Sequence, residues 1–213
     1  MVSRIATYGA FKRGVDLVLA LTMLVVFLPL LLIVAVIIKL DSPGPVLFRQ
    51  KRTGKNGKEF EILKFRSMVA DNDAMDSTRE NQYTRFGRII RRTSIDELPQ
   101  LINIVKGEMA FIGPRPWVPE YYKNMNKRER GRVAVRPGIT GLAAAKGRND
   151  LTVFEKIDYD LEYINHYSLR MDMKVIYCTA KTVLSREGAE GGKAQLHSDI
   201  QDLMAENNFL RNM

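Results

Sequence analysis

Two adjacent carboxylates, Asp96 and Glu97, are the residues of this 213-residue chain best suited to chemistry. Arg91 precedes them, and Arg115 follows in the sequence Gly-Pro-Arg-Pro, where the prolines restrict the backbone to extended geometry. Carboxylates can hold a divalent cation, and arginines bind phosphate through paired hydrogen bonds. Together these residues indicate phosphate chemistry.

The same acids also have a purely structural interpretation. Ser94 and Glu97 have the spacing of a capping box, and acids stabilise the first turn of a helix through its macrodipole. Pro99 is tolerated only in a first turn, so the predicted helix over residues 96–105 begins at the two acids. That position, with arginines nearby, favours the ionised form of a carboxylate.

The bulk composition restricts the class of partner. A net charge of +9 and a pI near 9.7 require an anionic partner such as nucleic acid, anionic lipid or a phosphorylated substrate. The single cysteine, Cys178, excludes an intramolecular disulfide. His166 and His197 are too few and too far apart for a histidine metal site. No nucleic-acid-binding motif is present.

An uncharged apolar segment from Leu17 to Ile38 is long enough to cross a bilayer as a helix. Basic residues lie on both sides of it, and the positive-inside rule would keep both flanks in the cytoplasm. Pro29, near its middle, removes a helix hydrogen bond. The pattern predicts a helix–break–helix that enters and leaves one leaflet, with a kinked spanning helix as the alternative.

A β-hairpin should follow, with strands over residues 46–53 and 58–65 joined by Gly54-Lys-Asn-Gly57. Lys64 and Arg66 alternate with Phe65, so both could point to one face, either as a phosphate clamp or as solvated side chains. The polar loop 70–82 contains Asp71-Asn-Asp73, a form that some glycosyltransferases use to hold a metal-diphosphate, although chance occurrence in so polar a segment is the preferred explanation.

Helices are predicted over 121–132, 151–166, 169–186 and 196–210 in the second half of the chain. The helices over 151–166 and 169–186 follow the hairpin region, and the basic one at 169–186 could lie in a membrane interface or pack on the core. After a linker at 188–192, a helix over 196–210 needs a partner subunit or the domain's own surface to cover its apolar face. We therefore expect a membrane segment (1–40), a catalytic domain (41–187) and an accessory tail (188–213).

Five motifs in this order resemble the bacterial sugar transferase family, the polyprenyl-phosphate phosphoglycosyl transferases with a monotopic anchor. They cover roughly residues 11–187 and are Lys12-Arg13-x-x-Asp16, Lys64-Phe65-Arg66-Ser67-Met68, Asp96-Glu97-Leu98-Pro99-Gln100, Gly113-Pro114-Arg115-Pro116 and Arg136-Pro137-Gly138-Ile139-Thr140-Gly141. The resemblance implies a mostly α fold with a small β-hairpin: a re-entrant membrane helix-break-helix and a cytosolic α/β catalytic domain with amphipathic interface helices. Leu28 replaces the family's usual serine before the hairpin proline, and Leu142 and Ala144 replace its Trp and Gln.

The resemblance also implies an activity. The family transfers a phosphosugar from a UDP-sugar, here expected to be N-acetylated, to undecaprenyl phosphate and releases UMP at the cytoplasmic face of the bacterial inner membrane. Asp96 matches the nucleophile and Glu97 its partner, and both match positions around Mg²⁺. The substrate-binding positions match Lys64, Arg91, Arg115, Arg136 and Arg148, and the membrane-anchor positions match Arg13, Asp16 and Pro29.

Other partners and activities remain open. Membrane phospholipid and a homodimer formed through the C-terminal helix are expected partners, and nucleic acid is not. A metal-dependent glycosyltransferase using Asp71 and Asp73 would release UDP in place of UMP. A non-enzymatic basic membrane scaffold would show no Mg²⁺-dependent turnover and a strongly salt-sensitive affinity.

Overall fold

The computed structural model describes residues 2–69, 83–147, 151–185, 199–205 and 207. Helices dominate, and the described strands form two small sheets, the antiparallel pair β1–β2 and the parallel pair β3–β4. This confirms a mostly α fold with a small β-hairpin. In chain order the elements are α1 (Val2–Asp41), β1 (Leu47–Thr53), η1 (Lys55–Gly57), β2 (Glu59–Phe65), α2 (Arg85–Arg92), η2 (Ile95–Glu97), α3 (Gln100–Lys106), β3 (Ala110–Ile112), α4 (Pro119–Asn124), η3 (Glu129–Val133), β4 (Gly138–Thr140), α5 (Leu142–Lys146), α6 (Val153–Asn165) and α7 (Leu169–Ser185).

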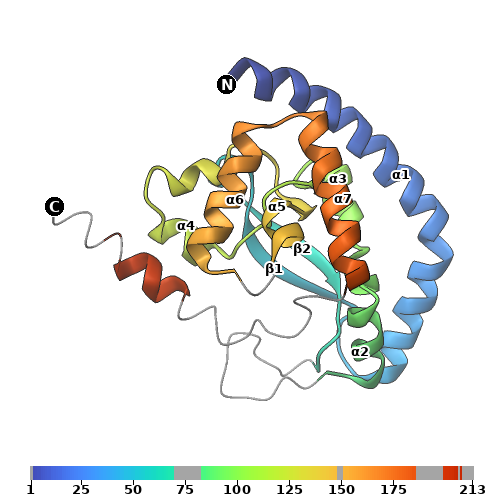
Figure 1. Cartoon of the computed structure of the whole chain (residues 1–213). Helices are drawn as coiled ribbons and strands as arrows, with labels where there is room; N and C mark the ends of the chain where they lie inside the picture. Colours follow the sequence, from blue (N-terminus) through green and yellow to red (C-terminus); the bar gives the residue numbers. More distant parts are fainter. Residues whose placement is uncertain (1, 70–82, 148–150, 186–198, 206, 208–213) are drawn as a thin grey trace.

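The N-terminal helix α1 is continuous through Pro29, so the break predicted at this proline is absent. α1 instead curves along one side of the domain (Figure 1). A proline removes one hydrogen bond, and a long helix can absorb that loss by bending. The helix is long and apolar enough to cross a membrane. Its outer side exposes large apolar residues, among them Val25 at 74% and Leu40 at 82%, whereas Val34 and Ile38 are buried against the domain.

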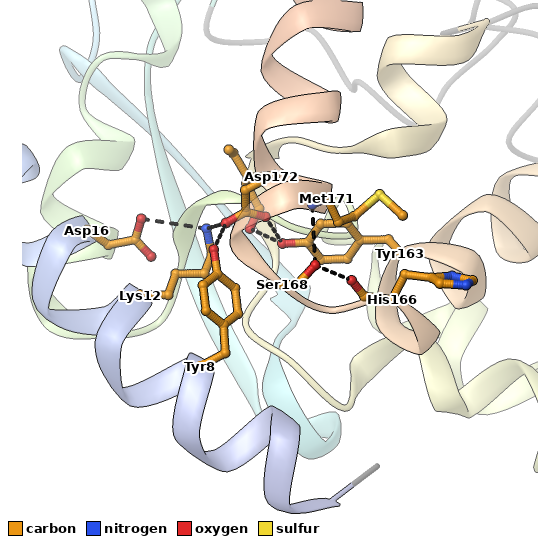
Figure 2. Close-up of polar contacts among 9 residues, drawn as sticks. Tyr8, Lys12, Asp16, Tyr163, His166, Ser168, Met171 and Asp172 are labelled. Atoms are coloured by element: carbon orange, nitrogen blue, oxygen red, sulfur yellow. Dashed lines mark hydrogen bonds and ion pairs between the residues drawn. The ribbon is translucent and has the colours of Figure 1, made fainter.

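The two ends of α1 are both fixed to the domain. Figure 2 shows the N-terminal attachment, where Lys12 Nζ lies 2.6 Å from Asp172 Oδ2 on α7 and 3.9 Å from Asp16 Oδ1. The hydroxyls of Tyr8 and Tyr163 donate to the same Asp172 carboxylate, each at 2.6 Å. Because these groups are largely buried, their geometry is strongly constrained.

At its C-terminal end α1 is held by Arg66, which follows β2. The Arg66 guanidinium donates to the carbonyls of Ser42 and Pro43, each at 2.7 Å. Asp41, the last residue of α1, accepts a hydrogen bond from the backbone N–H of Phe86 at 3.2 Å and so caps the start of α2. Arg66 is therefore a structural cation, because it satisfies carbonyls that a helix end leaves free.

The predicted hairpin is confirmed within a residue at each end. β1 and β2 pair from Leu47 opposite Phe65 to Thr53 opposite Glu59. The connecting turn places Asn56 at φ 57° and Gly57 at φ 77°, the left-handed conformation that asparagine and glycine adopt most readily. The hairpin carries Lys64 near the end of its second strand, where it faces η2 and α3.

The helices α6 and α7 form much of one hydrophobic cluster with α5. The C-terminal segment packs against a second cluster. Residues 199–205 are helical, and Leu203 is fully buried in a cluster that includes Val118, Tyr121 and Ile157. The Tyr121 hydroxyl also donates to Asp199 at 3.2 Å. Of the apolar residues in this segment, Leu203 is thus covered by the chain's own domain, whereas Met204 is 47% exposed. The homodimer expected through this helix stays a prediction.

Candidate active site

Asp96 and Glu97 lie in η2, a single 3-10 turn between α2 and α3. Ser94 adopts the left-handed conformation, with φ 57°, and its side chain caps nothing. The Glu97 backbone N–H bonds the carbonyl of Ser94 at 3.1 Å instead. The capping box predicted from these residues is therefore wrong, because the serine hydroxyl is directed away and the Glu97 side chain binds elsewhere.

Glu97 binds two cations that are distant in sequence. Its Oε1 accepts from Lys64 Nζ at 2.7 Å and from Arg115 Nη2 at 3.1 Å. Burial opposes ionisation of this carboxyl group, but the charges and hydrogen bonds of Arg115 and Lys64 outweigh it and lower the Glu97 pKa to about 2. Glu97 is thus a permanent anion at neutral pH, and it brings together the predicted residues Lys64, Glu97 and Arg115.

Asp96 has a different environment from its neighbour. Asp96 is 8% exposed, and it forms no salt bridge with any residue that the structure describes. Burial and the adjacent charge of Glu97 raise its pKa above the usual value, against the opposing charges of Lys64 and Arg91. The expectation that the site favours ionised Asp96 is therefore corrected, since desolvation dominates. An ionised carboxylate without a close counterion is a more available nucleophile.

Asn103, which the sequence analysis did not single out, positions these groups. It lies in α3 and is fully buried. Its Oδ1 accepts from the backbone N–H of Leu63 at 3.0 Å, and its Nδ2 donates to the carbonyl of Glu61 at 2.7 Å. The side chain therefore pairs with β2 as a neighbouring strand would, and holds Lys64 against η2. The signal in the sequence that could have identified Asn103 is its position as a polar residue within the apolar stripe of a predicted helix.

The Arg115 loop is held from behind by Arg132. The Arg132 guanidinium donates to the carbonyl of Arg115 at 2.9 Å and to Asp160 Oδ2 at 2.6 Å, and it stacks over the ring of Trp117 at 3.8 Å. Gly113 permits the close approach of the next loop, because a Cβ there would lie 2.4 Å from the Arg136 carbonyl oxygen. The rigid presentation predicted for Arg115 therefore depends on long-range contacts as well as on its prolines.

Other predicted residues lie at different places. Arg91 stacks over Tyr83 at 5.0 Å, close enough to Asp96 to act on its charge. Arg136 donates to the carbonyl of Gly107, at the far end of α3 from Asp96. Arg13 binds the carbonyls of Ile104 and Val105 at that same end, so it caps α3. Arg148, Asp71 and Asp73 lie outside the described residues.

Asp96 and Glu97 are the carboxylates that this site offers to Mg²⁺. This ion usually binds one or two carboxylates and completes its shell with water and substrate phosphates. In the described ranges, no three acidic, histidine or cysteine side chains gather into a metal-binding group. Asp96 and Glu97 are adjacent, and Glu97 already binds two cations. The pair therefore suits an ion that is held mainly by substrate phosphates.

Comparisons with known proteins identify one family and several relatives. The profile of the bacterial sugar transferase family matches residues 7–186. The UDP-glucose:undecaprenyl-phosphate glucose-1-phosphate transferase of Caulobacter vibrioides is 40% identical over 84% of this chain and 71% of that protein. The exopolysaccharide production protein PSS of Rhizobium leguminosarum is 41% identical over 82% of this chain and 96% of that protein.

A third relative has a different sugar in its name. The UDP-N-acetylgalactosamine-undecaprenyl-phosphate N-acetylgalactosaminephosphotransferase of Aeromonas hydrophila is 39% identical over 85% of this chain. The chain spans 45% of the length of that relative. The shared region therefore occurs both as nearly a whole protein and as part of longer ones.

Proposed function

The chain belongs to the bacterial sugar transferase family, and from that premise we propose that it transfers a phosphosugar from a UDP-sugar to undecaprenyl phosphate and releases UMP. The names of the relatives support the substrate classes. The observation that carries the proposal is the contrast between two neighbouring acids. Glu97 is neutralised by Lys64 and Arg115, whereas Asp96 is buried without a salt bridge to a described residue.

The contrast suits a two-step transfer through Asp96. In the first step an oxygen of the Asp96 carboxylate attacks the β-phosphorus, an acyl-phosphate bond forms, and the bond from that phosphorus to the bridging oxygen breaks to release UMP. In the second step a phosphate oxygen of the lipid attacks the same phosphorus. The acyl-phosphate bond breaks, the Asp96 carboxylate is restored, and the lipid diphosphosugar leaves.

The surrounding charges support both steps. Lys64 and Arg115 can donate to phosphoryl oxygens where negative charge develops, while Glu97 keeps the two cations oriented. Mg²⁺, held by Asp96 and Glu97 together with the substrate phosphates, would supply further neutralisation of phosphate charge. Burial of Asp96 reduces its hydration, so less water has to be removed before attack.

The proposed location is the cytoplasmic face of the bacterial inner membrane, with α1 entering and leaving the same leaflet. Both ends of α1 are bonded to one domain, through Lys12 with Asp172 and through Arg66 with Ser42. A straight span would separate those ends by the thickness of the bilayer. The exposed apolar side of α1 and the exposed Leu169, Met173 and Tyr177 of α7 provide surfaces for contact with phospholipid.

The test is product identification with purified protein and undecaprenyl phosphate. The panel contains UDP-N-acetylgalactosamine, UDP-N-acetylglucosamine and UDP-glucose, since we propose an N-acetylated donor while relatives are named for both kinds. We expect Mg²⁺-dependent release of UMP and a phosphosugar adduct on Asp96 in the absence of lipid acceptor. Release of UDP would indicate the Asp-x-Asp glycosyltransferase, and no turnover of any donor would favour the scaffold.

A further inference from the structure

Arg52, near the end of β1, is a third cation beside the Arg115 loop. Its Nη1 donates to the carbonyl of Pro116 at 3.2 Å, and its Nη2 donates to Gln50 Oε1. Pro116 directly follows Arg115, so the guanidinium of Arg52 lies against the backbone that presents Arg115. No motif that identified the family contains Arg52.

Arg52 is a partly buried arginine without a close counterion among the described residues. Within the described residues it forms no salt bridge, and its Nε is buried without a hydrogen-bond partner. Burial and then the charge of Arg115 lower the pKa of Arg52 to about 10, while Glu97 acts in the opposite direction. Two arginines therefore repel each other at this loop, and such an arrangement is unfavourable until an anion binds.

The next residue, Thr53, also has a buried polar atom without a hydrogen-bond partner in the described part of the chain. This atom is Oγ1, and Thr53 as a whole is 3% exposed. Thr53, Arg115 and Pro116 line one small pocket that opens to solvent. Buried polar atoms without partners are rare and mark places where a partner is missing. The Thr53 hydroxyl therefore marks a place for a ligand on the Arg115 loop, and Arg52 contacts Pro116 in the wall of the same cavity without lining it.

The charge balance indicates the kind of ligand. Lys64 and Arg115 share the single carboxylate of Glu97, and Arg52 adds a further positive charge beside them. With the Asp96 carboxylate counted as well, three cations face two anions, and the excess of positive charge suits an anionic ligand. Arginine binds phosphate oxygens through paired hydrogen bonds, so two arginines match two linked phosphates.

We propose that Arg52 acts with Arg115 to bind the diphosphate of the nucleotide-sugar donor. This assignment rests on the proposed function and adds a donor-binding residue to it. We assign Arg52 to the donor and not to the lipid phosphate, because the UDP-sugar carries two linked phosphates and undecaprenyl phosphate carries one.

The experiment compares Arg52→Gln with Arg49→Gln in the full-length protein. Arg49 lies on the same strand with a side chain that is 63% exposed, so both variants remove one charge from β1. Binding of UDP and of inorganic pyrophosphate is measured by calorimetry. We expect Arg52→Gln to raise both Kd values about tenfold or more, as for loss of a charge-assisted hydrogen bond, and Arg49→Gln to change them less than about twofold.

Two further measurements separate binding from support of the loop. In steady-state assays Arg52→Gln should raise the KM for the UDP-sugar and leave the KM for undecaprenyl phosphate unchanged. If Arg52 only supported Pro116, the variant would melt at a lower temperature without ligand, yet UDP would still raise its melting temperature as much as in the wild type. We expect the UDP-induced rise to shrink.

Several outcomes would overturn the inference: an unchanged UDP affinity in Arg52→Gln, an equal loss in Arg49→Gln, or an effect confined to the lipid acceptor. Failure of wild-type protein to bind UDP or pyrophosphate would also overturn it. Release of UDP by a wild-type protein that binds pyrophosphate through Arg52 would refute the proposed function and leave this inference standing.

Discussion

The side-chain oxygen of Asn103 lies 3.0 Å from the backbone nitrogen of Leu63 and accepts its hydrogen bond. This contact joins α3, which follows the two acids, to β2, which carries Lys64 one residue further on. The distance between Lys64 and Glu97 is therefore set by a buried amide as well as by their mutual attraction. In this protein the geometry of the proposed catalytic site and the fold of the hairpin depend on the same side chain.

Replacement of Asn103 by alanine should leave the backbone groups of Glu61 and Leu63 without partners. We expect a loss of about 1–3 kcal/mol in the free energy of unfolding, the cost of buried unsatisfied polar groups. The kcat per folded molecule should fall as well, because Lys64 is no longer held at Glu97. Denaturant titration and kinetics measure the two effects. Asn165→Ala, at an exposed position, is the control and should change neither.

Glu97 should make stability depend on pH in the acid range. Its pKa is about 2 in the folded protein and 4.5 for an unperturbed glutamate, so its stabilising contribution is complete above about pH 4.5. That contribution is lost as the pH falls toward 2. Glu97→Gln should flatten the dependence of melting temperature on pH in this window and lower stability at neutral pH. Glu61→Gln, with a side chain that is 55% exposed, should leave the pH dependence unchanged.

At Asp96, the ionised form that activity requires should reduce the stability of the fold. Its pKa is raised in the folded protein, chiefly by burial, so the ionised form costs stability at any pH above that value. Asp96→Asn should abolish phosphosugar transfer and yet melt at the same or a higher temperature in EDTA. In the wild type, kcat/KM should fall as the pH drops through the raised pKa. A variant that melts well below wild type would contradict this assignment.

The C-terminal helical segment 199–205 should contribute to the stability of the whole domain. Leu203 is completely buried, whereas the adjacent Met204 is 47% exposed. Leu203→Ala should lower the free energy of unfolding by about 2–5 kcal/mol, as for other large-to-small changes in a core. Met204→Ala should change it by less than about 0.5 kcal/mol. Equal effects of the two variants in denaturant titrations would show that the tail does not stay bound.

Local patterns predicted the hairpin and the two acids, because strand alternation, turn residues and the placement of Pro99 act over a few residues. The assembly of Lys64, Glu97 and Arg115 followed from the family motifs. The salt bridge between Arg132 and Asp160 and the amide of Asn103 could not be predicted, because their partners are brought close only by folding. The ionisation of Asp96 was misjudged for a related reason, since burial is not visible in sequence.

The ends of α1 give the last prediction, which concerns topology. Cys178 is replaced by serine, and one new cysteine is introduced at Gly14 or at Lys55, before and after the apolar segment. No atom lies within 4 Å of a Cβ built at Gly14, and Lys55 is exposed in the hairpin turn, so both sites should accept the change.

Because both ends of α1 are bonded to one domain, an impermeant thiol reagent should label both cysteines in inverted vesicles and neither in intact cells with a permeabilised outer membrane. Labelling of the two positions from opposite sides would show that α1 spans the membrane, and the bonds of Lys12 to Asp172 and of Arg66 to Ser42 could not then coexist.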